Sequence, residues 1–512
     1  MTRSPLSFVW LVTSALAVSA CAMNEGDLDS VDESSAELRL RTKQLVQPGA
    51  QQVLLGVTED NFAVYQEGQV VYASKLERGA RRIHVADVPG TNTAFPLQVG
   101  KVMFIWSNPQ QNVPGLGVSP LVLFTGEHGA QVISAQSAVG LVATGASDDS
   151  RQILFTTRAS DDGQRGDLVL AQTRRPQEQT ILLENTTLGF PSAPCRPLAG
   201  FGGPALDSFV IAAHCAGSDT TATLSVWRHG HRRDLISGIR TPLPFFFDSD
   251  SELRKHVVSL ADGNLVEVEV SGDVTPIDTV APTRGFVNRA ETLGYAAPNA
   301  AGTGAELRLS LRGHLPATAI GPFRSFVVET YNRSGYWKRS PMSPDNRAVA
   351  YRSIVDPATG NTDFLFLDLV TGRSIALDPL PEVALTSQNW TADSRFALFI
   401  KGVDPTTGSG PLLAGNEHGV HQIGTSQTVF DTLRGFGSFI SYQENIVFDP
   451  VVFSASRADL AVADAESPSA VPRVVSLQAD INYFHSHAGR KIAFTSQTEP
   501  AGAGLYVADA IP

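Results

Sequence analysis

A turn followed by a short apolar strand recurs in this chain about every 45 to 50 residues. The clearest copies are SPDNRAVAY at 343–351 and TADSRFALF at 391–399, and related strands end at Phe155, Phe448 and Phe494. Units of this length that contain several short strands are typical of propeller blades. The spacing therefore predicts an all-β fold, a β-propeller of four-stranded antiparallel blades, with about eight to ten repeat units and a single ring favoured.

A second pattern predicts the strand that follows in each unit. It reads IHVAD at 83–87, LAVAD at 460–464 and LYVAD at 505–509. The last unit lacks a fourth strand of its own. We expect an N-terminal segment, either 38–46 or 53–57, to complete it, because that pairing removes the open sheet edges.

The turn sequence resembles the TolB-type propeller repeat, whose core is Ser-Pro-Asp-Gly, then a basic residue and a short apolar strand. Asn346, Ser394 and Ser150 stand where that family prefers Gly. The resemblance implies the same fold for most of 51–512, and it suggests envelope proteins as partners. If the repeats form two rings, the Pro- and Gly-rich stretch 276–304 is the expected boundary.

Four aspartates, Asp149, Asp345, Asp393 and Asp250, lie in turns that look equivalent. Asp and Ser side chains hydrogen-bond their own backbone in turns, which predicts a structural, turn-capping role. The alternative is a ring of carboxylates for general acid–base chemistry or calcium binding. We favour capping, because repetition in every unit is expected of a fold requirement, whereas a catalytic pair would be an exception to the pattern.

The first residues have the pattern of an export signal. Arg3 supplies a positive charge, and the uncharged apolar run 6–20 is too short to span a bilayer comfortably. The run ends in VSAC at 18–21, which resembles a bacterial lipobox. That resemblance implies cleavage before Cys21 and lipidation of Cys21, and Ala22 suggests retention at the outer membrane. We therefore expect a lipid-anchored protein of the bacterial cell envelope that faces the periplasm or the cell surface.

Residues 22–38 carry six acids and no base, a composition that predicts a flexible tether. The chain is accordingly divided into a lipoprotein signal peptide at 1–20, a lipidated acidic tether at 21–50 and a propeller domain at 51–512. The formal net charge of −12 argues against nucleic acid or anionic lipid headgroups as the main partner, but it does not exclude a local basic patch.

Two cysteines other than Cys21 are present, Cys195 and Cys215. An even number of cysteines in an oxidising compartment predicts a disulfide, and the alternative is two free buried thiols. Three pairs of closely spaced histidines also occur: His229 and His231, His418 and His421, and His485 and His487. No pair has a third Cys or acidic ligand at a fitting spacing, so we predict no metal site and no cofactor.

The sequence contains no Gly-x-Ser-x-Gly, Ser-x-x-Lys or His-Glu-x-x-His motif. The leading hypothesis is a non-enzymatic binding or scaffolding module with an envelope protein or peptide as its partner. The alternative is a propeller-fold glycan hydrolase or lyase with acidic residues in a central channel. Such enzymes often use two carboxylates about 5–10 Å apart.

Overall fold

The structure is a computed structural model of the chain. It describes residues 42–46, 52–77, 79–90, 93–107, 117–139, 144–147, 149–161, 163, 165–187, 198–201, 209–214, 221–228, 230–240, 247–249, 254–279, 284–288, 292–310, 318–323, 325–326, 342–345, 347–356, 361–378, 383–384, 390–401, 409–427, 434–449, 454–467, 472–485, 491–499 and 502–509. These residues form 39 strands and no helix, which confirms the predicted all-β class. Within the same ranges there is accordingly no helix long and apolar enough to cross a membrane.

The first four sheets, numbered in chain order, each contain four strands. Sheet 1 has β2 (Gln52–Val57), β3 (Phe62–Glu67), β4 (Val70–Lys75) and β5 (Ile83–Asp87); sheet 2 has β6 (Phe95–Val99), β7 (Val102–Trp106), β8 (Val118–Thr125) and β9 (Gly129–Ala138); sheet 3 has β10 (Gly145–Ala146), β11 (Gln152–Thr157), β12 (Arg165–Gln172) and β13 (Arg175–Thr187); sheet 4 has β14 (Leu198–Phe201), β15 (Phe209–His214), β16 (Thr221–Arg228) and β17 (His231–Arg240).

Sheets 5 to 8 repeat this arrangement, and sheet 9 has seven strands. Sheet 5 has β18 (Phe247–Ser249), β19 (Lys255–Ser259), β20 (Leu265–Glu269) and β21 (Val274–Asp278); sheet 6 has β22 (Arg284–Asn288), β23 (Thr292–Pro298), β24 (Ala305–Ser310) and β25 (Thr318–Phe323); sheet 7 has β26 (Ser325–Phe326), β27 (Ala348–Asp356), β28 (Asn361–Asp368) and β29 (Ser374–Asp378); sheet 8 has β30 (Val383–Ala384), β31 (Ala397–Lys401), β32 (Ser409–Asn416) and β33 (Gly419–Gln427); sheet 9 has β34 (Arg434–Phe436), β35 (Phe439–Asp449), β36 (Ser454–Asp464), β37 (Arg473–His485), β38 (Lys491–Ser496), β39 (Gly504–Asp509) and β1 (Thr42–Val46).

In sheets 1 to 8 each strand pairs antiparallel with the next strand along the chain. The second strands are the most apolar, and all five residues of β7, VMFIW, are buried. A strand that is apolar at every position must be covered on both faces, which requires sheets to be stacked against one another. The predicted four-stranded antiparallel units are therefore present.

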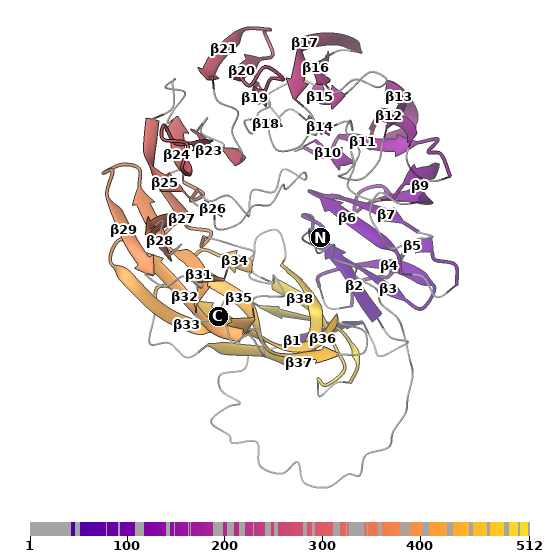
Figure 1. The fold of residues 1–512 in the computed structure, drawn as a ribbon. Helices are drawn as coiled ribbons and strands as arrows, with labels where there is room; N and C mark the ends of the chain where they lie inside the picture. The colour runs from indigo at the N-terminus through magenta and orange to yellow at the C-terminus, as the bar shows by residue number, and fades with distance from the viewer. Residues whose placement is uncertain are drawn as a thin grey trace, which may run out of the picture.

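Shared apolar cores join neighbouring sheets. Phe364 of sheet 7 and Phe399 of sheet 8 lie with ring centroids 4.9 Å apart in one such core. A core of the same kind joins sheet 1 to sheet 9, where Leu54 and Tyr65 pack with Leu505. Figure 1 shows the sheets in chain order around a common centre, with the last sheet beside the first.

The N-terminal segment completes the last sheet. β1 pairs antiparallel with β39, and Thr42 lies opposite Ala508. This pairing confirms the first of the two predicted segments, 38–46, whereas 53–57 belongs to β2 in sheet 1. The sheet structure therefore begins by Thr42, earlier than the predicted start of the propeller domain at residue 51, because the chain supplies the edge strand that β39 lacks.

One detail of the predicted repeat is wrong. The IHVAD segment is β5, the fourth and edge strand of its sheet, whereas LAVAD and LYVAD lie in β36 and β39, which are interior strands of sheet 9. The error arises because short apolar patterns do not specify a strand's position in its sheet. In β35 Tyr442 is fully buried, and the side chain of Phe448 lies outside the described residues.

A shared core also spans the stretch 276–304, the expected boundary if the repeats formed two rings. Val257, Leu265 and Ile277 of sheet 5 pack with Leu293 and Tyr295 of sheet 6. Sheets 5 and 6 are thus joined in the same way as the other neighbours.

Candidate functional site

Three of the four predicted turn aspartates, Asp149, Asp345 and Asp393, lie in what we call the entry turns, the turns immediately before the second strand of a sheet. In sheet 7 the Ser343 hydroxyl donates to Asp345 Oδ1 at 2.7 Å, and the Arg347 N–H donates to the same oxygen at 3.1 Å. The Ser343 oxygen accepts a hydrogen bond from the Ala348 N–H at 2.9 Å. The carboxylate and the hydroxyl therefore satisfy the backbone of their own turn.

The same bonds recur in two other sheets. In sheet 3 they run from Ser147 Oγ to Asp149 Oδ1 at 2.7 Å and from the Arg151 N–H to Asp149 Oδ1 at 3.0 Å. In sheet 8 they run from Thr391 Oγ1 to Asp393 Oδ1 at 2.6 Å and from the Arg395 N–H to Asp393 Oδ1 at 3.2 Å. Each of these carboxylates thus makes the same contacts with its own turn.

Neighbouring entry turns are also hydrogen-bonded to each other. The Asp345 N–H donates to Ser394 Oγ at 2.9 Å, and the Asp393 N–H donates to the Gly437 carbonyl at 3.2 Å. Sheets 1 to 3 are joined in the same way, by Glu59 N–H to the Gly100 carbonyl at 3.0 Å and Lys101 N–H to Ser150 Oγ at 3.2 Å. The acceptor residue has a positive φ in every case: 70° at Ser394, 60° at Gly437, 60° at Gly100 and 57° at Ser150. In each case, the residue with positive φ in one turn accepts a hydrogen bond from a backbone N–H of the preceding entry turn.

The histidine pairs are only partly within the described residues. His421 Nε2 lies 2.7 Å from the Ala465 carbonyl oxygen, and its ring packs edge-on against Phe396. His418 and His231 are exposed. No group of three or more His, Cys, Asp or Glu that would hold a metal ion occurs in the part of the chain that the structure describes.

The predicted cysteine sites lie outside the described residues. These are Cys21, Cys195 and Cys215. The turn residue Asp250 and the histidines His229 and His487 also lie outside them, as does the side chain of His485.

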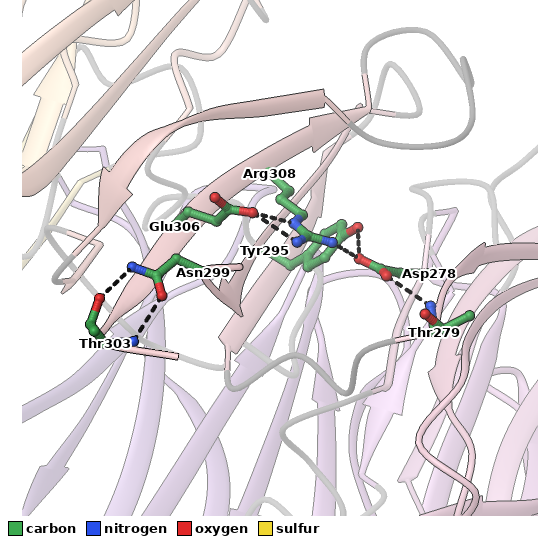
Figure 2. Close-up of polar contacts among 7 residues, drawn as sticks. All are labelled: Asp278, Thr279, Tyr295, Asn299, Thr303, Glu306 and Arg308. Carbon is green, nitrogen blue, oxygen red and sulfur yellow. Dashed lines mark hydrogen bonds and ion pairs between the residues drawn. The ribbon is translucent and has the colours of Figure 1, made fainter. Parts of the chain in front are cut away.

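A cluster of charged residues joins sheets 5 and 6 (Figure 2). Arg308 forms ion pairs with Asp278 and, at 2.7 Å, with Glu306, while the Tyr295 hydroxyl donates to Asp278 at 2.8 Å. Burial, followed by the hydrogen bond to Asp278, raises the pKa of Tyr295, so its hydroxyl stays protonated at neutral pH. Since Arg308 of sheet 6 pairs with Asp278 of sheet 5 as well as with Glu306 of its own sheet, the cluster acts as a cross-sheet tie.

A second pair of carboxylates lies in sheet 9, where Glu444 of β35 is directly opposite Asp459 of β36. Burial, followed by the nearby charge of Asp459, raises the pKa of Glu444. Asn445 donates to Asp459 Oδ2 at 2.7 Å. Like charges that face each other across two strands destabilise the sheet.

A hollow of about 520 Å³ lies on sheet 1, and we call it the basic hollow. Its cationic lining residues are Lys75, Arg81 and Arg82, while Phe62 and Ile83 supply apolar surface. Phe62 begins β3, Lys75 ends β4, and Ile83 begins β5, so the hollow lies at the end of the sheet where the β4–β5 connection turns. The chain carries a net charge of −12, which makes this concentration of positive charge unusual for its surface.

Two contacts fix the position of Arg82 in the basic hollow. Its guanidinium carbon lies 3.9 Å from the centroid of the Tyr72 ring, and its Nη2 lies 2.6 Å from Glu67 Oε2. His84 also lines the hollow, with its Nε2 2.9 Å from Asp87 Oδ1. Sequence reasoning missed this site, although the stretch KLERGARRIH at 75–84 is rich in basic residues.

The basic hollow lies beside the place where β1 joins the fold. Lys491, the first residue of β38, donates from Nζ to the Leu76 carbonyl in the β4–β5 connection at 2.9 Å. Lys491 is opposite Asp509 at the end of β39, and Thr42 at the start of β1 is opposite the neighbouring Ala508. The chain therefore enters the fold at the same end of the sheets that carries the hollow.

No protein-family model matches the chain. No curated protein matches it either. Similar solved structures include a putative TolB from Agrobacterium tumefaciens, with 14% identity, a TM-score of 0.27 and coverage of 55% of this chain and 94% of that chain. An oligogalacturonate lyase from Vibrio parahaemolyticus is 10% identical with a TM-score of 0.32, covering 64% of this chain and 97% of that chain. A eukaryotic initiation factor is 10% identical with a TM-score of 0.43, covering 85% of this chain and 90% of that chain. At these identities and scores the similarity identifies no family and carries no argument about function.

Proposed function

We propose that the chain is a lipid-anchored β-propeller that acts as a non-enzymatic binding platform of the bacterial cell envelope. In this proposal the sheets form one ring of ten blades, and sheet 9 supplies the last two. Those two blades share β37, whose first part pairs with β36 while its last part pairs with β38. β1 is the outermost strand of the tenth blade.

The observation that carries the proposal is the pairing of β1 with β39. β1, the strand that follows the proposed tether, therefore belongs to the last sheet, and the last sheet packs against the first sheet. A pull on a lipid at Cys21 would then act on a strand hydrogen-bonded into the fold. Such an arrangement suits a rigid body that is held near a membrane while its surface remains available to partners.

The non-enzymatic part of the proposal rests on how the repeated carboxylates are used. Asp149, Asp345 and Asp393 each accept two hydrogen bonds from their own turn. These bonds tie each carboxylate to the backbone and the hydroxyl of its own turn, which is the use expected of a turn cap. We therefore assign these residues a structural role in the turns.

The anchor is tested by membrane fractionation of cells that produce the chain with and without Cys21→Ala. We expect the unaltered chain in the membrane fraction and the variant in the soluble fraction. A variant that still carries labelled lipid, or an unaltered chain that is soluble, would overturn the anchor.

The binding role is tested by cross-linking in intact cells followed by mass spectrometry. We expect defined cross-links to one or a few envelope proteins from surface residues of the sheets. Purified chain that cleaves glycans, together with an absence of protein cross-links, would refute the platform and support the hydrolase or lyase alternative.

A further inference from the structure

We propose that the basic hollow binds the phosphate headgroup of an anionic phospholipid, so that this end of the sheets lies against the membrane surface. The inference rests on the proposed lipid anchor, and it adds a second, reversible contact with the same membrane. Its evidence is the charge of the hollow, its apolar lining residues and its place in the fold.

Two of the cations in the hollow are available to a ligand. Lys75 and Arg81 are exposed, and their side chains make no hydrogen bond or ion pair with another residue in the described part of the chain. Arg82 is held in place by Tyr72 and Glu67 and extends the positive surface. A phosphodiester is recognised by such groups, since guanidinium and ammonium donors form short, charge-assisted hydrogen bonds with its oxygens.

Apolar side chains form part of the lining of the hollow. Phe62 and Ile83 are partly exposed there, and Phe62 is supported edge-on by Phe124 with ring centroids 5.8 Å apart. A free inorganic anion would leave these groups in contact with water. The glycerol and first acyl carbons of a phospholipid would cover them, and burial of that apolar area favours the lipid over the bare anion. Glu77 is the one acid of the lining, and it lies on the loop with Arg81.

The position of the hollow favours a membrane ligand over a soluble one. The strand that follows the tether enters the fold beside Lys491, whose side chain contacts the loop of the hollow. An unstructured chain from Cys21 to Thr42 has a root-mean-square span of about 25 Å. A lipid anchor at Cys21 would therefore keep this end of the sheets close to the headgroups, where each basic residue gains attraction to an anionic surface.

The test is a calorimetric titration of the full chain with dihexanoyl phosphatidylglycerol, a soluble short-chain anionic phospholipid. Dihexanoyl phosphatidylcholine and inorganic phosphate are titrated in parallel. We expect saturable binding of the phosphatidylglycerol and much weaker binding of the other two. Equal binding of inorganic phosphate would replace the lipid assignment with a simple anion site, and no binding of any of the three would overturn the proposal.

The double variant Lys75→Glu with Arg81→Glu should weaken phosphatidylglycerol binding by at least about 30-fold, since two basic residues are lost and their charges reversed. The matched control is Arg174→Glu with Arg175→Glu, which makes the same charge change at the turn after the third strand of sheet 3. The control should bind as the unaltered chain does, because its arginines lie two sheets away. Equal losses in both variants would mean that net charge, and not the hollow, attracts the lipid. The Cys21→Ala fractionation is independent of this titration, so failure of the anchor and failure of the hollow are distinguishable.

Discussion

The hydrogen bonds between neighbouring entry turns make a prediction about Ser394. Its φ is 70°, a left-handed conformation that L-residues other than Gly rarely adopt. Its hydroxyl accepts the Asp345 N–H of the preceding sheet at 2.9 Å. A glycine would adopt this φ without strain, so we infer that the hydroxyl is the reason for a serine here. Ser394→Ala keeps the strain and loses the bond, whereas Ser394→Gly loses both.

The magnitudes follow from these two effects. A hydrogen bond of this kind contributes about 0.5–1.5 kcal/mol net, so Ser394→Ala should lower the free energy of unfolding by about 1 kcal/mol. In Ser394→Gly the relief of left-handed strain, about 1–2 kcal/mol, works against the same loss. The greater freedom of glycine in the unfolded chain removes about 0.4–1 kcal/mol of that gain. We therefore expect the glycine variant to lie between the unaltered chain and the alanine variant.

Two measurements separate the bond from the strain. Urea unfolding should place the stabilities in the order unaltered, Ser394→Gly, Ser394→Ala. Amide hydrogen exchange at Asp345 should become about 2- to 10-fold faster in both variants alike, because both lose the acceptor. Ser374→Ala is the control, since Ser374 is exposed at the start of β29. Unchanged exchange at Asp345 in both variants would refute the reasoning.

Three further predictions concern other positions. Gly100→Ala should destabilise the fold more than Gly437→Ala. Both glycines have a φ of 60°, but a Cβ at position 100 would lie 3.0 Å from Ser150 Oγ, whereas one at position 437 would meet no atom within 4 Å. Equal losses of stability on urea unfolding would contradict this prediction. Glu444→Gln should stabilise by roughly 0.5–1 kcal/mol at pH 7.5. The raised pKa means that ionised Glu444 is disfavoured in the fold, so the gain should vanish as the pH falls below the unfolded value, and a gain that is independent of pH would show another cause. Leu45→Asp should loosen β1 and expose it to limited proteolysis, and an unchanged digestion pattern would show that β1 does not protect that edge.

The repeat was predictable from the sequence because turns and buried strands have local signatures. Ser343, Asp345 and the apolar strand that follows them lie within nine residues, and their bonds are made within that segment. The position of a strand within its sheet was less predictable. IHVAD is similar to LYVAD as a segment, yet IHVAD is the edge strand β5 of its sheet and LYVAD lies in β39, between β38 and β1, because the connections and not the strands determine the order.

The candidate site was harder to predict than the fold. The reason for a serine at position 394 cannot be found in its own turn. Its hydroxyl accepts a hydrogen bond from Asp345, which lies 49 residues away in the chain. The basic hollow combines Phe62, Lys75 and Arg81 from two strands and a connection. The basic segment 75–84 gives no sign in the sequence that Phe62, from the neighbouring strand, lines the same hollow.

The junction between the first and last sheets explains why these features occur together. The Lys491–Leu76 bond joins residues 415 apart in sequence, and closing a loop of that length costs about 5 kcal/mol of chain entropy. The core that spans the junction includes Leu54, Tyr65 and Leu505. Full burial of each such side chain contributes about 1.5–3 kcal/mol, so two or three of them offset the closure. The contacts at this junction therefore have to offset the entropy lost when the chain ends are brought together. β1 and a ligand in the adjacent basic hollow would both add stability there. A membrane contact at the hollow would stabilise this interface, whose two sheets are far apart in sequence.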